Sequence, residues 1–151
     1  MKKRKKRIPP YILFLICVAL MIFLRWTWPV GVLLRYPINL VGLVPVITGL
    51  VSGGAGVFIF LRKRTNIHPF RKPDTLVTTG VFNYSRNPMY LGLCLVLVGA
   101  WMLLGAITPI LGVLIFVVIS DRWYIPPEER MLNEQFGKPY EDYRSRVRRW
   151  L

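Results

Sequence analysis

Residues 89–121, MYLGLCLVLVGAWMLLGAITPILGVLIFVVISD, contain two apolar runs joined by a short uncharged turn. The turn covers 105–109, and the second run ends at the polar residues Ser120, Asp121 and Arg122. A helix needs about 20 apolar residues to cross the hydrocarbon layer of a bilayer, which is about 30 Å thick. The stretch therefore predicts a hairpin of two transmembrane helices, at about 89–104 and 107–121.

Two further apolar blocks precede this hairpin, at about 8–24 and 37–61. The first follows a run of basic residues, as a signal peptide would, but Arg25-Trp26-Thr27-Trp28-Pro29 follows it in place of a small-residue cleavage site. It therefore predicts a retained span. In the second block, Gly49-x-x-x-Gly53 indicates close packing against another helix. The predicted fold is all-α: one polytopic membrane domain, 1–151, with four transmembrane helices and a cytoplasmic amphipathic tail helix, 126–151.

The basic residues predict the orientation of these spans. The chain has 21 Lys and Arg against 7 Asp and Glu, and 54% of its residues are hydrophobic. Of the basic residues, 19 lie in the N-terminal tail, in 62–88 or in 121–151, and the two opposite loops contain only Arg25 and Arg35. Cytoplasmic loops are enriched in Lys and Arg, so both termini are expected in the cytoplasm. Topology thus accounts for the net charge of +14, and no nucleic-acid partner is expected.

The remaining composition narrows the possible chemistry. No predicted span carries an ionisable residue near its middle, which disfavours an ion or drug exporter. Cys17 and Cys94 lie inside apolar blocks, without a CxxC pair or a Cys/His cluster, so they are interpreted as ordinary thiols and no metal site is expected. Chemistry is therefore expected on the cytoplasmic face.

Two polar segments of that face are predicted to meet. Thirty-eight residues separate Tyr90 from Glu128, which is about the length of two membrane crossings. The segment around Arg86 and Tyr90 should therefore lie at the same depth as Glu128 and Glu129. Pro126-Pro127 is expected to end the fourth span, with the two glutamates opening the tail helix, where carboxylates suit the positive helix end.

These segments resemble the isoprenylcysteine carboxyl methyltransferase and phospholipid methyltransferase superfamily. Its pattern is an Arg-His-Pro-x-Tyr-x-Gly segment, a helical hairpin, a Glu-Glu pair and a Phe-Gly-x-x-Tyr-x-x-Tyr tail. Asn87 stands at the histidine position, and an amide cannot titrate. The resemblance covers residues 67–151. The matching residues are Arg86, Pro88, Tyr90, Gly92, Glu128, Glu129, Phe136, Gly137, Tyr140 and Tyr143.

The resemblance implies S-adenosylmethionine as the cofactor and a lipophilic small-molecule or lipidated acceptor. It implies cofactor contacts from Tyr84, Arg86, Asn87, Tyr90, Gly92, Glu128, Glu129, Tyr140 and Tyr143, and catalytic roles for His68, Glu128 and Glu129. Simpler roles stay open: Arg86 as a topological anchor, the glutamates as a helix cap, and His68 as a loop residue. Arg146, Arg148 and Arg149 are expected to contact membrane lipids rather than the site.

Two other functions remain open at this stage. The chain could be a non-catalytic membrane protein that binds a lipid or a partner, or an enzyme similar to sterol reductases, which use a nicotinamide cofactor. The motif residues favour the methyltransferase, and the pattern leaves the acceptor and the oligomeric state open.

Overall fold

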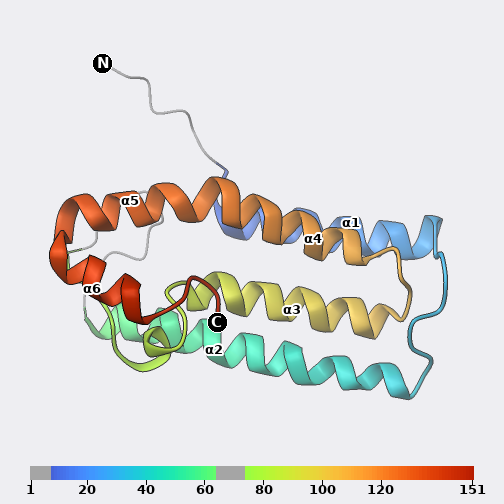
Figure 1. The fold of residues 1–151 in the computed structure, drawn as a ribbon. Coiled ribbons are helices and arrows are strands. Elements are labelled where there is room, and N and C mark those ends of the chain that lie inside the picture. Colours follow the sequence, from blue (N-terminus) through green and yellow to red (C-terminus); the bar gives the residue numbers. More distant parts are fainter. Residues whose placement is uncertain (1–7, 64–73) are drawn as a thin grey trace.

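The computed structural model describes residues 8–63 and 74–151, and the regular elements in these ranges are helices (Figure 1). This confirms the predicted all-α class. The elements are α1 (Pro10–Thr27), η1 (Ile38–Gly42), α2 (Leu43–Arg62), η2 (Gly80–Asn83), α3 (Pro88–Leu104), α4 (Ile110–Ile119), η3 (Ser120–Tyr124), α5 (Ile125–Phe136) and α6 (Lys138–Arg146).

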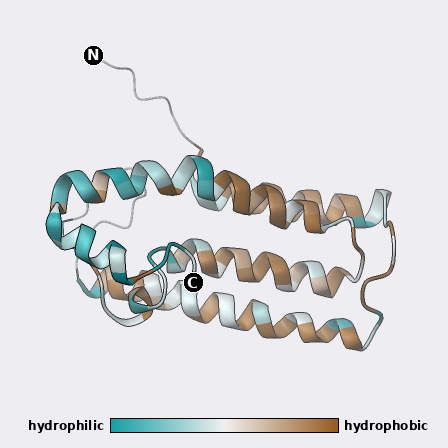
Figure 2. Ribbon diagram, in the orientation of Figure 1, coloured by the Kyte–Doolittle hydropathy of each residue, from teal (hydrophilic) through white to brown (hydrophobic). Residues whose placement is uncertain are grey.

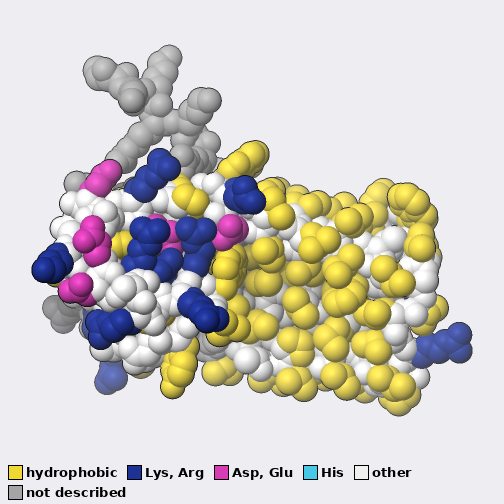
Figure 3. Space-filling model, in the orientation of Figure 1, with side chains coloured by type: hydrophobic (Ala, Val, Ile, Leu, Met, Phe, Trp, Pro, Cys, Tyr) yellow, Lys and Arg dark blue, Asp and Glu magenta, His cyan; other side chains and the backbone are white. Residues whose placement is uncertain are grey.

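The long helices form an elongated bundle in which α2 packs mainly against α3 and α1 packs against α4 (Figure 1). Within the described ranges, three helical segments are long and apolar enough to cross a membrane: Pro10–Thr27, Ile38–Arg62 and Ile110–Phe136. The fourth apolar helix, α3, is shorter, with 17 residues. Hydrophobic residues run along the bundle, and hydrophilic residues gather at the end that carries α5 and α6 (Figure 2). The space-filling view shows the same division between apolar and charged side chains (Figure 3).

Glycines bring α2 and α3 into close contact, as the Gly49-x-x-x-Gly53 pattern predicts. A Cβ atom built on Gly92 of α3 would lie 2.6 Å from the backbone oxygen of Gly49 and 2.8 Å from the Cα of Gly53. These distances are shorter than real Cβ contacts, so the two backbones touch only because the side chains are missing. Gly92 is therefore a packing residue between helices.

The helix that contains the predicted fourth span does not end at Pro126-Pro127. The helix continues from α4 through η3 into α5, and η3 is a π-helical turn in which Ile125 N–H donates to Ser120 O. Proline has no N–H to donate and crowds the preceding turn, which normally breaks a helix. The wider π-helical turn directly before Pro126 changes the bonding register there, so the helix passes through the two prolines.

The tail is likewise not one helix over 126–151. It divides at Gly137, which has a φ of +56°, a conformation that side-chain-bearing residues rarely adopt. The chain reverses there, and α6 begins with Pro139 in its first turn, a position that tolerates proline. After α6 the chain leaves the helical conformation, and residues 147–151, here called the C-terminal strap, run back to the start of α3 (Figure 1).

Two hydrophobic clusters hold the arrangement. The larger lies between α1, α3 and α4 and includes Cys17, Leu97 and Phe116. The smaller fixes the tail, because Tyr140 and Tyr143 of α6 pack with residues of the segment that precedes α3. The apolar side of the tail thus contacts the protein core. The residues of the smaller cluster are Val77, Phe82, Tyr140 and Tyr143, with Val147 packed against them.

Candidate active site

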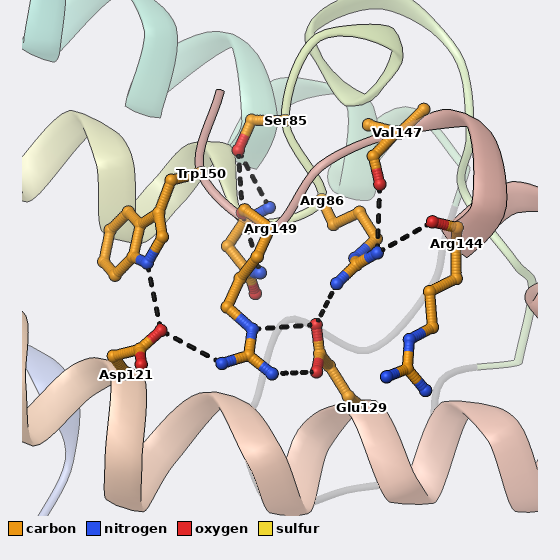
Figure 4. Close-up of polar contacts among 9 residues, drawn as sticks. Ser85, Arg86, Asp121, Glu129, Arg144, Val147, Arg149 and Trp150 are labelled. Atoms are coloured by element: carbon orange, nitrogen blue, oxygen red, sulfur yellow. Dashed lines mark hydrogen bonds and ion pairs between the residues drawn. The ribbon is translucent and has the colours of Figure 1, made fainter.

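The polar end of the bundle is organised around the carboxylate of Glu129, on α5. Arg86, two residues before α3, places Nη2 at 2.8 Å from Glu129 Oε1, and Arg149 of the C-terminal strap places Nη2 at 2.6 Å from Glu129 Oε2 (Figure 4). The side chains of Arg86 and Glu129 are each only 9% exposed. One carboxylate therefore receives charge-assisted hydrogen bonds from two guanidinium groups, which are among the strong hydrogen bonds of proteins.

The C-terminal strap is bound to the segment before α3 through its backbone carbonyls. Arg86 N–H donates to Arg148 O at 3.0 Å, and Arg86 Nη1 donates to Val147 O at 3.0 Å. The side-chain amide of Asn87 donates to Arg149 O at 3.1 Å. Asn87, which stands where the family pattern has histidine, thus binds the C-terminal strap in this chain.

Asp121, in the η3 turn before α5, anchors the strap from the other side. Its Oδ1 accepts hydrogen bonds from Arg149 Nη1 at 3.0 Å and from Trp150 Nε1 at 3.1 Å (Figure 4). Arg149 is therefore shared between two carboxylates. The expectation that Arg149 contacts lipid headgroups is wrong, because its guanidinium is engaged inside the protein.

A second hydrogen-bonded pair, formed by Tyr90 and Glu128, lies beside this network. Tyr90, in the first turn of α3, donates its hydroxyl hydrogen to Glu128 Oε1 at 2.8 Å. The segments around Tyr90 and Glu128 therefore meet, as their spacing in the sequence predicts. The other oxygen of Glu128 accepts no hydrogen bond from the described residues, in contrast to Glu129, whose two oxygens both have partners.

Both pairs line one pocket of about 110 Å³ with largely apolar walls. Seven predicted site residues lie around it, whereas Tyr84 is 76% exposed and lies outside, and Gly92 packs against α2. His68 lies outside the described residues. The pocket is lined by Phe60, Val77, Phe82, Arg86, Asn87, Pro88, Met89, Tyr90, Glu128, Glu129, Leu132, Tyr140 and Tyr143.

Two donor groups of this lining are buried without a partner in the described part of the chain. They are Nε of Arg86 and the hydroxyl of Tyr140. Burying a donor without a partner costs free energy, and such groups are rare in folded proteins. Together with the open oxygen of Glu128, the pocket offers two hydrogen-bond donors and one acceptor to a bound molecule.

The tail groups around the pocket keep their usual charge states. Burial raises the pKa of the Tyr140 and Tyr143 phenols above the ordinary tyrosine value. Both therefore remain neutral hydrogen-bond donors, and Tyr143 donates to Phe82 O at 2.7 Å. The hydrogen bond to Glu129 raises the pKa of the Arg149 guanidinium, which stays charged.

Sequence reasoning missed Asp121, Arg149 and Trp150 as parts of the site. One signal was available: a buried carboxylate pair needs more positive charge than Arg86 alone provides. The sequence does not show which of the several tail arginines provides it, because that depends on the reversal at Gly137. Among the described residues, no group of three or more His, Cys, Asp or Glu could hold a metal ion.

The fold and this pocket define a helical membrane protein whose polar residues converge at one end of an apolar bundle. The sequence profile described as phospholipid methyltransferase matches residues 38–139, which is more than half of the chain. The chain therefore belongs to the phospholipid methyltransferase family.

The chain is also similar to individual proteins, two of which are named methyltransferases. The chain is 37% identical over 78 residues to the protein-S-isoprenylcysteine O-methyltransferase of Schizosaccharomyces pombe, an alignment that covers 50% of this chain and 32% of that protein. It is 32% identical over 111 residues to protein-S-isoprenylcysteine O-methyltransferase B of Arabidopsis thaliana, covering 70% of this chain and 55% of the relative. It is also 41% identical over 63 residues to an uncharacterized protein of Haemophilus influenzae, covering 42% of this chain and all of the relative. The chain thus spans 32% of the Schizosaccharomyces pombe methyltransferase and 55% of the Arabidopsis thaliana methyltransferase.

Proposed function

We propose that the protein transfers a methyl group from S-adenosylmethionine to a lipophilic acceptor, an isoprenylcysteine-like carboxylate or a lipid amine, at the cytoplasmic face of the membrane. The observation that carries this proposal is the meeting of Glu128, Glu129 and Arg86 in one pocket at the polar end of the bundle. Family membership supports the reaction class, and the names of the methyltransferase relatives support the kind of acceptor.

The open polar groups of the pocket fit the donor molecule. Its carboxylate can accept from Nε of Arg86, and a hydroxyl can pair with Tyr140, because both groups are buried without partners among the described residues. Its ammonium or sulfonium suits the open oxygen of Glu128. Glu129 instead holds Arg86 in place, so the two neighbouring glutamates have different roles in this proposal.

When bound, S-adenosylmethionine supplies an electrophilic methyl group on a positively charged sulfur. The residues of this chain would align the acceptor with that methyl group and exclude water, and alignment alone can supply several kcal/mol. The apolar walls from Phe60, Val77 and Phe82 serve the second purpose. The pocket of about 110 Å³ is smaller than the several hundred Å³ usual for such ligands, so its walls must separate on binding.

Glu128→Gln tests the role given to Glu128. The substitution keeps the shape of the side chain and replaces the carboxyl group with an amide, which cannot become a carboxylate beside the ligand's ammonium. Affinity for S-adenosylhomocysteine should therefore fall by roughly 1.5–3 kcal/mol, the usual contribution of a hydrogen bond to a charged group. Isothermal titration of the purified protein measures this change. Glu134→Gln, on the exposed side of the same helix, is the matched control and should bind as the parent does.

Three outcomes would count against parts of this proposal. Equal affinity in Glu128→Gln and the parent would remove Glu128 from the donor site. Failure of the parent protein to bind S-adenosylhomocysteine would remove the methyltransferase proposal as a whole. Binding of a nicotinamide cofactor instead would favour the function similar to sterol reductases.

We further propose that α3 crosses the membrane together with the three longer segments, so that four spans place both termini in the cytoplasm. Ser145→Cys, on the exposed side of α6, should then react with a membrane-impermeant thiol reagent only after cells are opened. Val32→Cys, in the loop after α1 and 64% exposed, should react in intact cells. The reverse labelling pattern would show the opposite orientation.

A further inference from the structure

The distal end of the bundle, away from the candidate active site, is closed by the loops 28–37 and 105–109. Leu33 N–H donates to Gly105 O at 2.8 Å, and the hydroxyl of Thr108 donates to Trp28 O at 2.7 Å. These bonds tie the loop after α1 to the loop after α3. Further links are the bond from Ile107 N–H to Val30 O at 3.2 Å and the antiparallel bridge between Val32 and Ala106.

A cavity of about 390 Å³ lies between these loops, and Arg25 and Arg35 both line it. Arg25, in the last turn of α1, donates from Nε to Leu104 O at 2.9 Å. A guanidinium has five N–H donors, so this bond orients the group and leaves four donors. The side chain of Arg35 donates no hydrogen bond to any residue that the structure describes. The cavity therefore presents two cationic groups with open donors.

No carboxylate of this end neutralises the two arginines. The first acidic residue of the chain is Asp74, and neither distal loop contains Asp or Glu. Among the basic residues that the structure describes, only Arg25 and Arg35 belong to this end of the bundle, and both line the same cavity. The counter-charge of this cavity must therefore come from a molecule outside the chain.

The depth of the cavity indicates which molecule supplies that charge. Tyr36 lines the cavity and is 81% exposed. Trp26 and Trp28, which neighbour the lining residues Arg25 and Pro29 in the sequence, are 82% and 66% exposed. Exposed Trp and Tyr at the ends of spans lie at the level of the lipid headgroups. The cavity is therefore level with the phosphates of one leaflet, and guanidinium groups bind phosphate oxygens in pairs of parallel hydrogen bonds.

We propose that this cavity binds the phosphodiester of a phospholipid headgroup, with Arg25 and Arg35 as the donors. Free inorganic phosphate has the same recognition chemistry. The lipid is the better occupant because exposed apolar side chains next to the cavity, among them Val32 and Ile38, provide a surface for its acyl chains. The site does not depend on the methyl-transfer proposal, or on which side of the membrane the distal end faces.

The test is a titration of the full-length protein in detergent with dioleoylphosphatidylglycerol, followed by native mass spectrometry. In the double variant Arg25→Gln/Arg35→Gln, the dissociation constant of the first lipid should rise by at least about tenfold, as expected for loss of charge-assisted hydrogen bonds. The matched control is Arg130→Gln/Lys138→Gln, which removes the same charge from exposed positions at the polar end. It should leave that dissociation constant nearly unchanged.

Arg35→Gln alone guards against a folding defect, because its side chain makes no hydrogen bond to the described residues, and it should still weaken binding several-fold. Dioleoylglycerol, which lacks the phosphate, should bind equally weakly to the parent and to the double variant. The proposal is overturned if the double variant binds the lipid as the parent does, or if the control loses as much affinity. It is also overturned if millimolar inorganic phosphate displaces the lipid, since the cavity would then be a site for free anions.

Discussion

Replacing Glu129 with alanine is expected to lower the free energy of unfolding by roughly 3–5 kcal/mol, the cost of breaking a buried ion pair by removing one partner. The substitution removes the carboxylate that pairs with the guanidinium of Arg86. Because the Arg86 side chain is only 9% exposed, this leaves a buried charge without its partner. It also releases Arg149, which joins the C-terminal strap to α5. Thermal unfolding in detergent, followed by circular dichroism, measures the loss.

Two control variants separate this effect from a general loss of negative charge. Glu134→Ala, exposed on the same helix, should change stability by no more than about 0.5 kcal/mol. Arg149→Ala should be intermediate, because its side chain is 30% exposed and Glu129 keeps Arg86 as a partner. If Glu129→Ala and Glu134→Ala unfold at the same temperature, the network around Glu129 does not stabilise the fold. Added salt should alter the difference little, since buried pairs are weakly screened.

The part of this structure that the sequence predicts rests on the lengths of apolar runs and on the number of residues between them. Apolar runs of about the membrane thickness give the positions of the four apolar helices, and the uncharged turn at 105–109 gives the hairpin. The contact between Tyr90 and Glu128 follows from counting residues along two adjacent helices. Each of these conclusions needs only the geometry of a helix and the thickness of a bilayer.

The part that sequence reasoning missed depends on how the chain departs from regular helices. Pro126-Pro127 predicts a break, but the preceding π-helical turn lets the helix continue. No residue pattern in the sequence predicts that turn. Gly137 then reverses the chain and carries the strap to Arg86, which brings Arg149 to Glu129 across 20 residues of sequence. A basic residue in an arginine-rich tail cannot be assigned to an ion pair until that path is known.

The same limit explains the different outcomes at Tyr84 and Gly92. Both lie within the family-like segment, so the resemblance placed them at the cofactor. Tyr84, which directly follows the short η2 turn, is 76% exposed and does not line the pocket. Gly92 lies two residues after Tyr90, which places it on another face of α3, toward α2. A motif shows which residues occur together and leaves open which of them share a face.

Substituting leucine for Gly92 is expected to destabilise the protein by about 3 kcal/mol or more, at or above the upper end of usual overpacking costs. The new Cβ would lie 2.6 Å from Gly49 O and 2.8 Å from Gly53 Cα, and backbone atoms within a helix cannot move aside singly. The helices α2 and α3 would have to separate. Because α3 carries Tyr90 and α2 carries Phe60, the pocket walls would shift as well, and affinity for S-adenosylhomocysteine should fall together with stability.

Gly54→Leu is the matched control for this prediction. Gly54 lies on the same helix as Gly49, but a Cβ built on it would meet nothing within 4 Å. Leucine there adds an apolar side chain to an exposed face of α2 and replaces a residue of low helix propensity, so stability should hold or rise slightly. Resistance to unfolding by sodium dodecyl sulfate, measured for both variants and the parent in the same detergent, compares the two positions directly. If both variants resist sodium dodecyl sulfate as well as the parent does, the backbones of α2 and α3 are not in contact in the folded protein. If both lose stability alike, the damage comes from placing leucine in these apolar helices and not from the contact between Gly92 and Gly49.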